Sequence, residues 1–544
     1  MMEGSPLLLA LVPLAPLLLA LMTALATGRG LALARALVPW AALPALTVGL
    51  MGDTQLRLDT ALMGAMLALD ATGRVFLLPM SVLWLTTALL MRPRLQTRDA
   101  GGLAILMLLA MAGTFAMAVA GDGLLFYTAA AIAGYALYGV LAITADTGGC
   151  RAARVLVIFL IAGDLMVFEV LMTLALDATA ANFGTLRQAL LHTAHPGLIL
   201  TLLVAGFGTK LGLLGLHFWL PPVMVSGGRA LAPAVLAFTL GAGLLGGLRL
   251  LPLGDLTAPV AAEVLRWMAW VTLAYALATG LLQTHRRGVL AYAAIALGGL
   301  WLAVLSQQLQ SPGVWQGVVG PLATVLIQAT FALTALLLMP GTAVKGIVGW
   351  SAVVLLAAAP GALAAMAPGP WLPVVSAMGV LGFLAASALL RHSPTGAGPP
   401  AHAGNGGSTV PAALMALLAL AAAAYRPVAG WPVLAPAALV VVPAALAAAL
   451  LARRFLTPRL PALPPGDLVV PLRHLLLALR RHGLRATSHG RPRPGDGGPT
   501  LAGRLGSGSA PQRLAARIEA FLGRWPVAVM AGLLLGLLLA GLGA

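Results

Sequence analysis

Charge, lysine and cysteine are scarce in this sequence. Only 9% of its 544 residues are charged, whereas 60% are hydrophobic, and the mean hydropathy is +0.98. Such a composition excludes a soluble globular domain. The single cysteine, Cys150, excludes an internal disulfide and a thiolate metal cluster. Because no G-x-G-x-x-G fingerprint follows a predicted strand and the sequence has no nucleotide-binding loop, we expect no cofactor and no catalytic site of its own.

Long hydrophobic runs take up most of the chain instead. A helix needs about 20 mostly apolar residues to cross a bilayer, where it satisfies its own backbone hydrogen bonds. The sequence therefore predicts an all-α polytopic membrane protein with about 14–16 transmembrane helices. We divide it into transmembrane helices 1–3 (1–100), spans 4–8 (101–251), spans 9–13 (252–390), a connector with spans 14 and 15 (391–457), a basic cytoplasmic segment with amphipathic helices (458–524) and a final anchoring span (525–544).

The formal net charge of +17 comes almost entirely from arginine, since only Lys210 and Lys345 are lysines. Thirteen of the thirty arginines lie in residues 453–524, and most of the others lie in short loops after odd-numbered spans. The positive-inside rule places these loops in the cytoplasm and both termini on the periplasmic side of a bacterial-type inner membrane. We therefore expect the lipid bilayer, and no nucleic acid, as the partner of this charge.

A few ionisable residues lie deep in the predicted spans, namely Asp164, Glu169, Lys210 and His217. A charge at the bilayer centre costs about 2.5–3.5 kcal/mol on insertion scales, so each is a candidate functional residue. Arg249 and Arg266 lie near span ends, where we expect them to snorkel to an interface.

Lys210 lies well inside its span and needs a partner. Burial favours its neutral amine, whereas a nearby carboxylate favours the ammonium, so a lysine between the two can accept and release a proton. Asp164 and Glu169 are the carboxylates deep enough to pair with it. They are five residues apart and point roughly 140° apart on a helix, so both cannot face one lysine.

The stretch KLGLLGLHFWLP (210–221) resembles the signature of the antiporter-like subunits shared by respiratory complex I, Mrp-type Na⁺/H⁺ antiporters and energy-converting hydrogenases. That signature reads approximately K-x-G-x-x-P-L-H-x-W-L-P, so Lys210, Gly212, His217, Trp219 and Pro221 recur in register. Departures from the pattern occur at two positions, where Gly215 replaces the usual proline and Pro222 the usual aspartate.

Three further stretches are similar to the same family, over about residues 60–390. Leu69-Asp70 opens span 3 like the family's L-D motif, and GDGLLFY (121–127), which contains Asp122, resembles the entry to its span 5. THRRGVLAYAAIALGG (284–299), which contains Arg287, resembles the segment before its span 10. The resemblance implies that residues 101–251 and 252–390 are two inverted five-helix repeats, with broken helices in spans 7 and 12.

The resemblance also implies a line of charged residues across the bilayer, most of which this sequence lacks. Lys210 matches the span 7 lysine. The remaining positions read Ala131 or a neighbouring alanine in span 5, Gly241 in span 8, Ala332 or Leu333 in span 11, and Met366 or Ala367 in span 12. Gln328 and Leu297 stand where the family has histidines. A relay needs titratable groups or water at intervals, so a continuous path of the family type is not expected.

Lys210 then has three interpretations. It is a remnant of the first half-channel, with Asp164 or Glu169 replacing the lost glutamate; or it stabilises the break in span 7 by donating to helix-end carbonyls; or it couples to a partner subunit. For His217 we weigh a structural role, holding loop carbonyls, against a role as proton carrier.

Two functions follow. The chain is an antiporter-like membrane subunit of a multisubunit complex that moves H⁺ or Na⁺, with a residual proton path at Lys210, or it is a non-conducting paralogue that serves as a scaffold. In both hypotheses its partners are other membrane subunits and the bilayer, and any NADH:quinone oxidoreductase-like or hydrogenase chemistry belongs to those subunits.

Overall fold

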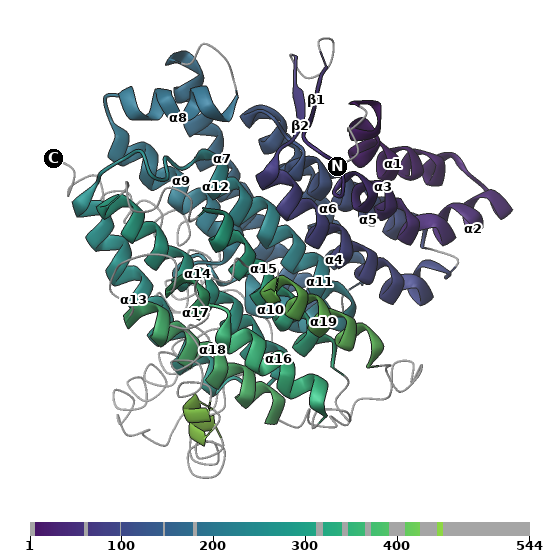
Figure 1. Ribbon diagram of the computed structural model, residues 1–544. Coiled ribbons are helices and arrows are strands. Elements are labelled where there is room, and N and C mark those ends of the chain that lie inside the picture. Colours follow the sequence, from purple (N-terminus) through teal and green to yellow (C-terminus); the bar gives the residue numbers. More distant parts are fainter. Residues whose placement is uncertain are drawn as a thin grey trace, which may run out of the picture.

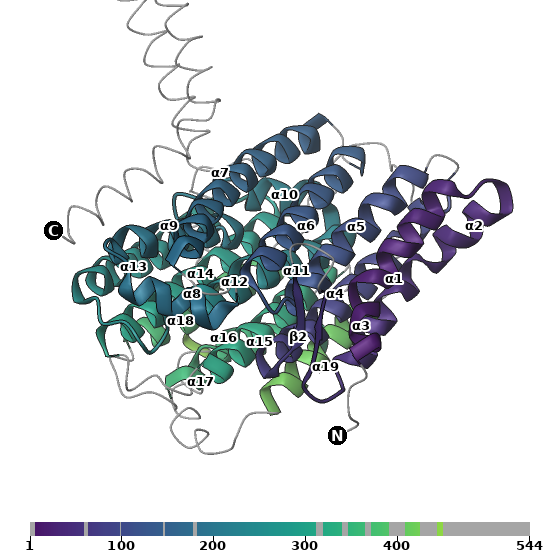
Figure 2. The same cartoon turned by 90° about the horizontal axis from the view of Figure 1, so that it is seen from above.

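The structure is a bundle of apolar helices (Figure 1, Figure 2). The computed structural model describes residues 6–58, 64–97, 100–144, 147–177, 182–311, 319–339, 346–364, 372–390, 409–424, 443–445 and 447–449. The helices of its first half are α1 (Pro6–Leu25), α2 (Gly28–Leu37), the 3₁₀ helix η1 (Val38–Ala42), α3 (Leu43–Val48), α4 (Ala71–Leu95), α5 (Gly101–Ala118), α6 (Gly123–Thr144), α7 (Thr147–Asp177), α8 (Phe183–His192), α9 (Pro196–Leu211), α10 (Leu220–Ser226), α11 (Gly228–Phe238), the π-helix η2 (Thr239–Leu245) and α12 (Gly246–Leu250). They are followed by α13 (Pro259–Leu282), α14 (Arg286–Gln310), α15 (Val319–Leu338), α16 (Ile347–Ala358), α17 (Gly361–Ala364), α18 (Leu372–Leu390) and α19 (Val410–Ala424).

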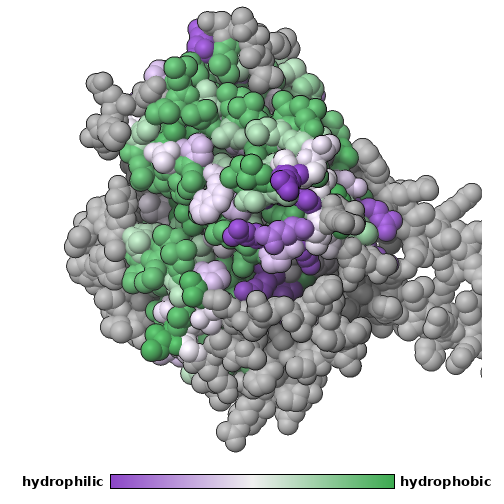
Figure 3. Space-filling view, turned by 90° about the vertical axis from the view of Figure 1, so that its right-hand side faces the viewer, coloured by the Kyte–Doolittle hydropathy of each residue, from purple (hydrophilic) through white to green (hydrophobic). Residues whose placement is uncertain are grey.

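The predicted polytopic helical fold is confirmed. Within the described part of the chain, ten helices are long and apolar enough to cross a membrane, and four shorter apolar helices accompany them. The side of the molecule that carries α1 and α2 has a largely hydrophobic surface with hydrophilic residues gathered in one region (Figure 3). The basic segment 458–524, the final span 525–544, most of the connector and Lys345 lie outside the described residues.

Loop contacts follow the expected alternation of the spans. Residues at the span ends expected on the cytoplasmic side contact each other through the pairs Arg35–Thr97 and Arg287–Val225. Loops after even-numbered spans contact each other through the pairs Asp122–Asn182 and Ala258–Leu309. This sorting is the one expected of helices that cross in alternating directions.

One element departs from the all-α prediction. The segment between α3 and α4 contains an antiparallel hairpin of β1 (Thr54–Arg57) and β2 (Met66–Leu69), in which Thr54 pairs with Leu69 and Arg57 with Met66. Leu67 bridges to Ala120, at the end of α5. Strand pairing satisfies backbone groups that a segment this short could not satisfy as a helix.

Two aspartates of the recognised motifs hold this end of the bundle. The Asp122 carboxylate accepts hydrogen bonds from the backbone N–H groups of Met66 (2.8 Å) and Leu125 (2.7 Å), so it joins β2 to the start of α6. Asp70 is the N-cap of α4 and accepts from Gly73 N at 2.6 Å. Such caps satisfy backbone donors at helix starts that have no helical partner.

The expectation that Arg249 snorkels to an interface is wrong. Its side chain is 7% exposed and donates to the Asp70 carboxylate at 2.9 Å and to the Ala118 carbonyl at 3.3 Å. Its guanidinium also lies 5.0 Å above the centre of the Phe183 ring. Tertiary contacts bring a carboxylate 179 residues away in sequence to the arginine, so it needs no route to the interface. Arg266 pairs locally with Glu263.

Helix breaks occur in both of the spans in which they are predicted. Span 7 is divided into α9 and α10, which are joined by residues 212–219. In span 12, α16 ends at Ala358, and the short α17 follows Pro360. Met366 and Ala367 lie outside the described residues. The inverted relation between the two halves and the domain boundaries remain predictions.

Glycines bring the backbones of α7 and α9 together. A Cβ atom at Gly163 would lie 1.9 Å from Thr209 Oγ1 and 3.0 Å from the Gly206 carbonyl oxygen. A Cβ at Gly206 would lie 2.7 Å from a Val167 methyl group. Small residues at such a crossing permit the close helix packing that stabilises membrane bundles.

We predict that Gly163→Ala destabilises the protein by about 1–3 kcal/mol, the usual cost of overpacking. The added methyl group must push α7 away from α9. Thermal unfolding of the detergent-purified protein measures the effect. The control is Gly197→Ala in α9, where no atom lies within 4 Å of the added methyl. Equal melting temperatures for the two variants would contradict the prediction.

Candidate functional site

Lys210 and Asp164 form a buried ion pair between α9 and α7. Lys210 Nζ lies 2.5 Å from Asp164 Oδ1, and the side chains are 2% and 6% exposed. The two residues are 46 positions apart in sequence and meet because α7 packs closely on α9. Since the pair is shielded from water, each charge depends on the other, and removal of one would leave an isolated buried charge.

The helix break begins directly after Lys210. Gly212 has φ of +70° and Gly215 of +82°, a left-handed conformation that glycine adopts without strain. The indole N–H of Trp219 donates to the Thr209 carbonyl at 2.6 Å, so it satisfies an acceptor at the end of α9. Pro221 lies in the first turn of α10, where its missing N–H is tolerated. The helix-end contact proposed for Lys210 is thus made by Trp219, and the lysine is directed to Asp164.

His217 lies in the loop of this break and is 1% exposed. Its ring stacks on Phe218, with centres 4.6 Å apart, and meets the rings of Tyr275 and Tyr292 at 5.2 and 6.2 Å. Aromatic packing therefore surrounds the imidazole and holds the loop against α13 and α14.

Glu169 does not join the pair. It lies on the exposed side of α7, whereas Asp164 faces inward, as their angular separation predicts. Of the two candidate carboxylates, the structure places Asp164 beside the lysine.

Tyr135 of α6 is the member of this cluster that the sequence analysis missed. The side chain lies near the Asp164 carboxylate, and 38% of the residue is exposed on the outside of the bundle. Tyr135 therefore lies between a buried carboxylate and the surface formed by α6 and α7. A polar side chain within the apolar run TAAAIAGYALYG (128–139) was the available signal.

Arg287 lies at the opposite end of α10 from the break. Its guanidinium donates to the Val225 carbonyl at 3.3 Å, which ties α10 to the start of α14. Burial lowers the pKa of the neighbouring His285, and the positive charge of Arg287 lowers it further. The neutral imidazole can then accept the Arg287 backbone N–H through Nδ1, at 3.3 Å.

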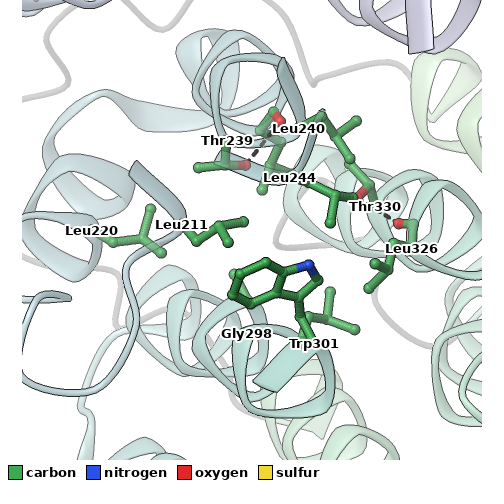
Figure 4. Close-up of a pocket in the computed structure, with 12 residues that line it drawn as sticks. Leu211, Leu220, Thr239, Leu240, Leu244, Gly298, Trp301, Leu326 and Thr330 are labelled. Carbon is green, nitrogen blue, oxygen red and sulfur yellow. Dashed lines mark hydrogen bonds between the residues drawn. The ribbon is translucent and has the colours of Figure 1, made fainter. Parts of the chain in front are cut away.

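A small apolar cavity lies beside the break (Figure 4). Its volume is about 40 Å³, space for a few water molecules. Its walls come from α9, α10, α11, η2, α14 and α15 and consist of Leu211, Leu220, Leu236, Thr239, Leu240, Leu244, Ala294, Leu297, Gly298, Trp301, Leu326 and Thr330. The hydroxyls of Thr239 and Thr330 donate to carbonyls of their own helices. No side chain lining this cavity titrates near neutral pH.

The cavity lies where the resemblance would place axis charges. Leu297, at the position of a family histidine, lines it directly, and Gly241, at the position of a family lysine, lies in the π-helix that forms one wall. Gln328 donates to the Leu355 carbonyl at 2.9 Å and so connects α15 to α16. The path from Lys210 toward the second half therefore meets apolar side chains.

Comparison with known proteins agrees with this architecture. Residues 120–366 match the family model described as NADH:quinone oxidoreductase/Mrp antiporter, TM. The fold is similar to a chain of the Mrp complex from Dietzia sp. DQ12-45-1b, with a TM-score of 0.63 and 18% identity over 96% of this chain. This chain spans 63% of that one.

A second similar structure is the membrane-bound sulfane sulfur reductase (MBS), an archaeal respiratory membrane complex. Here the TM-score is 0.55 and the identity 17%, over 81% of this chain and 98% of the other. No curated protein matches. The matched residues 120–366 contain the ion pair and the broken helix of span 7, so this part of the chain is similar to the antiporter-like membrane segment that the family model describes.

Proposed function

We propose that the chain is an antiporter-like membrane subunit of a multisubunit proton- or sodium-translocating complex, with a residual proton path at Lys210. It would lie in a bacterial-type inner membrane with both termini periplasmic. The observation that carries this proposal is the buried Lys210–Asp164 pair at the end of a broken helix. A structural ion pair could be replaced by apolar packing at little cost, so its presence in an apolar bundle supports a role beyond stability.

The pair can exist in two forms. Either the lysine is protonated and Asp164 ionised, or the proton has moved to Asp164 and both groups are neutral. In a low-dielectric interior the Coulomb attraction favours the first form and the desolvation cost favours the second. A change in nearby charge or hydration therefore moves the proton between Nζ and the carboxylate, which is the elementary step of a gated path.

Tyr135 extends this step toward the surface of the bundle. A hydroxyl both donates and accepts hydrogen bonds, so it can pass a proton between Asp164 and a group outside α6. On the other side of the lysine, the apolar cavity offers no titratable side chain. We infer a short lateral path through the first half of the subunit rather than a relay across both halves.

We expect Lys210→Arg to reduce ion transport at least tenfold in vesicles that contain the whole complex. Arginine keeps the positive charge beside Asp164 but does not release its proton in proteins. Transport driven by sodium or proton gradients is compared with wild type, and native gels verify assembly. Undiminished transport in an intact complex would refute the path and support the scaffold function.

Removal of the lysine charge alone should destabilise the chain. We predict that Lys210→Met lowers the free energy of unfolding by about 3–5 kcal/mol, because Asp164 is left as an uncompensated buried charge. Lys210→Met/Asp164→Asn should recover most of this loss while lacking the exchangeable pair. Thermal unfolding in detergent measures both variants. Equal destabilisation by the single and double variants would show that charge is not the cause.

Tyr135→Phe should lower transport several-fold and change its pH dependence, because the hydroxyl proposed to pass protons to and from Asp164 is removed. Tyr127→Phe is the matched control on the same helix. The Tyr127 ring packs against Phe168 with centres 5.7 Å apart, and the phenylalanine variant keeps that contact. A pH profile that changes equally in both variants would argue against a specific role for Tyr135.

The second candidate is the non-conducting scaffold, and the cavity favours it. A relay toward the second half would run through this cavity, which is lined mostly by leucine, glycine, alanine and tryptophan. In this case Lys210 and Asp164 would hold α7 to α9 and ion movement would belong to partner subunits. The scaffold function then predicts that the assembled Lys210→Met/Asp164→Asn variant transports ions as well as wild type. The proton-path function predicts a loss of transport.

A further inference from the structure

One side of the bundle carries a charge that it does not neutralise. Helices α6 and α7 pack against each other at an edge of the bundle (Figure 2). The outward side chains of this pair, which we call the α6–α7 face, are Ile132, Tyr135, Leu165, Phe168, Glu169 and Met172. The four from α7 follow the i, i+3, i+4, i+7 spacing of a single helical stripe.

Glu169 is the exception in this apolar stripe. It lies inside the apolar span Gly149–Ala175, roughly 9 Å from the end of that span at the helical rise of 1.5 Å per residue. Among the described residues no ion pair involves Glu169. The helix positions three and four residues away carry no charge, since they hold Leu165, Met166, Met172 and Thr173.

Glu263, a second exposed glutamate in an apolar helix, differs from Glu169 because it has an arginine partner. Glu263 of α13 has Arg266 one turn later, and the two side chains form an ion pair. That surface neutralises its own carboxylate and can face lipid headgroups at the span end. Glu169 has no such arginine, and large apolar side chains surround it.

Contact with lipid hydrocarbon is unfavourable for the Glu169 carboxylate. Contact with water is unfavourable for the leucine, phenylalanine and methionine side chains of the same face. A neighbouring helix with an apolar stripe and one basic side chain would bury the apolar side chains and also pair with the carboxylate.

We propose that a transmembrane helix of a neighbouring subunit covers the α6–α7 face and presents a lysine or arginine to Glu169. The inference rests on the proposed membership of a multisubunit complex, but not on proton transfer at Lys210. The helix packs on Leu165, Phe168 and Met172 and closes the outer side of Tyr135. The partner cation then lies close to the lateral end of the proposed path.

The test places a photo-crosslinking benzoylphenylalanine at Leu165 in the whole complex and identifies the attached peptide by mass spectrometry. We expect a transmembrane peptide of another subunit that contains lysine or arginine, and at least a tenfold loss of this product in the Glu169→Lys background. Glu263→Gln is the matched control and should leave the yield unchanged.

Three outcomes would overturn the proposal: crosslinks to lipid alone, crosslinks to this chain's own residues 451–544, or a partner peptide whose yield does not depend on Glu169. Lys210→Arg keeps the face intact, so it should leave the crosslink unchanged even where transport is lost. A failure of the proposed ion path and a failure of the interface are therefore distinguished.

Discussion

The contact between Lys210 and Asp164 is the interaction on which the first half of this bundle depends. Each group alone would be an isolated charge in a nearly water-free bundle, and together they form a pair 2.5 Å apart. The pair demands that α7 and α9 lie close, and the glycines at 163 and 206 make that approach possible. It also stands at the point where α9 ends, so the charge, the packing and the helix break share one location.

The break itself is stabilised without the help of the lysine. Trp219 donates to the Thr209 carbonyl, Gly212 turns the chain, and the His217 ring fills the space beside Tyr275 and Tyr292. Because other residues satisfy the helix end, the Lys210 amine is available to Asp164. Because these roles are separate, a sequence without most of the axis charges of the similar family can still have the span 7 motif and the local geometry that the motif builds.

The loss of those charges has a structural counterpart. At the place where the family carries lysine and histidine, leucines and two threonines surround a small cavity next to a π-helix. The threonine hydroxyls donate to their own backbones, and this leaves only their acceptor lone pairs toward the cavity. The first half thus has an ionisable pair with Tyr135 near it, while the cavity toward the second half is lined by apolar side chains. If the lateral path and the neighbour proposed for the α6–α7 face both hold, that neighbour belongs to the same functional unit.

The sequence by itself determined that the chain lies in a membrane, that its fold is helical and that it carries the motif at Lys210. Hydrophobic runs of membrane-spanning length are local in the chain, and so are the glycine, tryptophan and proline that end and restart a helix; the family match over residues 120–366 agrees with them. Only the tertiary structure decided which carboxylate meets Lys210, that Tyr135 joins it, and that Arg249 binds Asp70 rather than the interface. The physical reason is that helix periodicity gives the direction of a side chain within its own helix, whereas the identity of its neighbour depends on how distant helices pack.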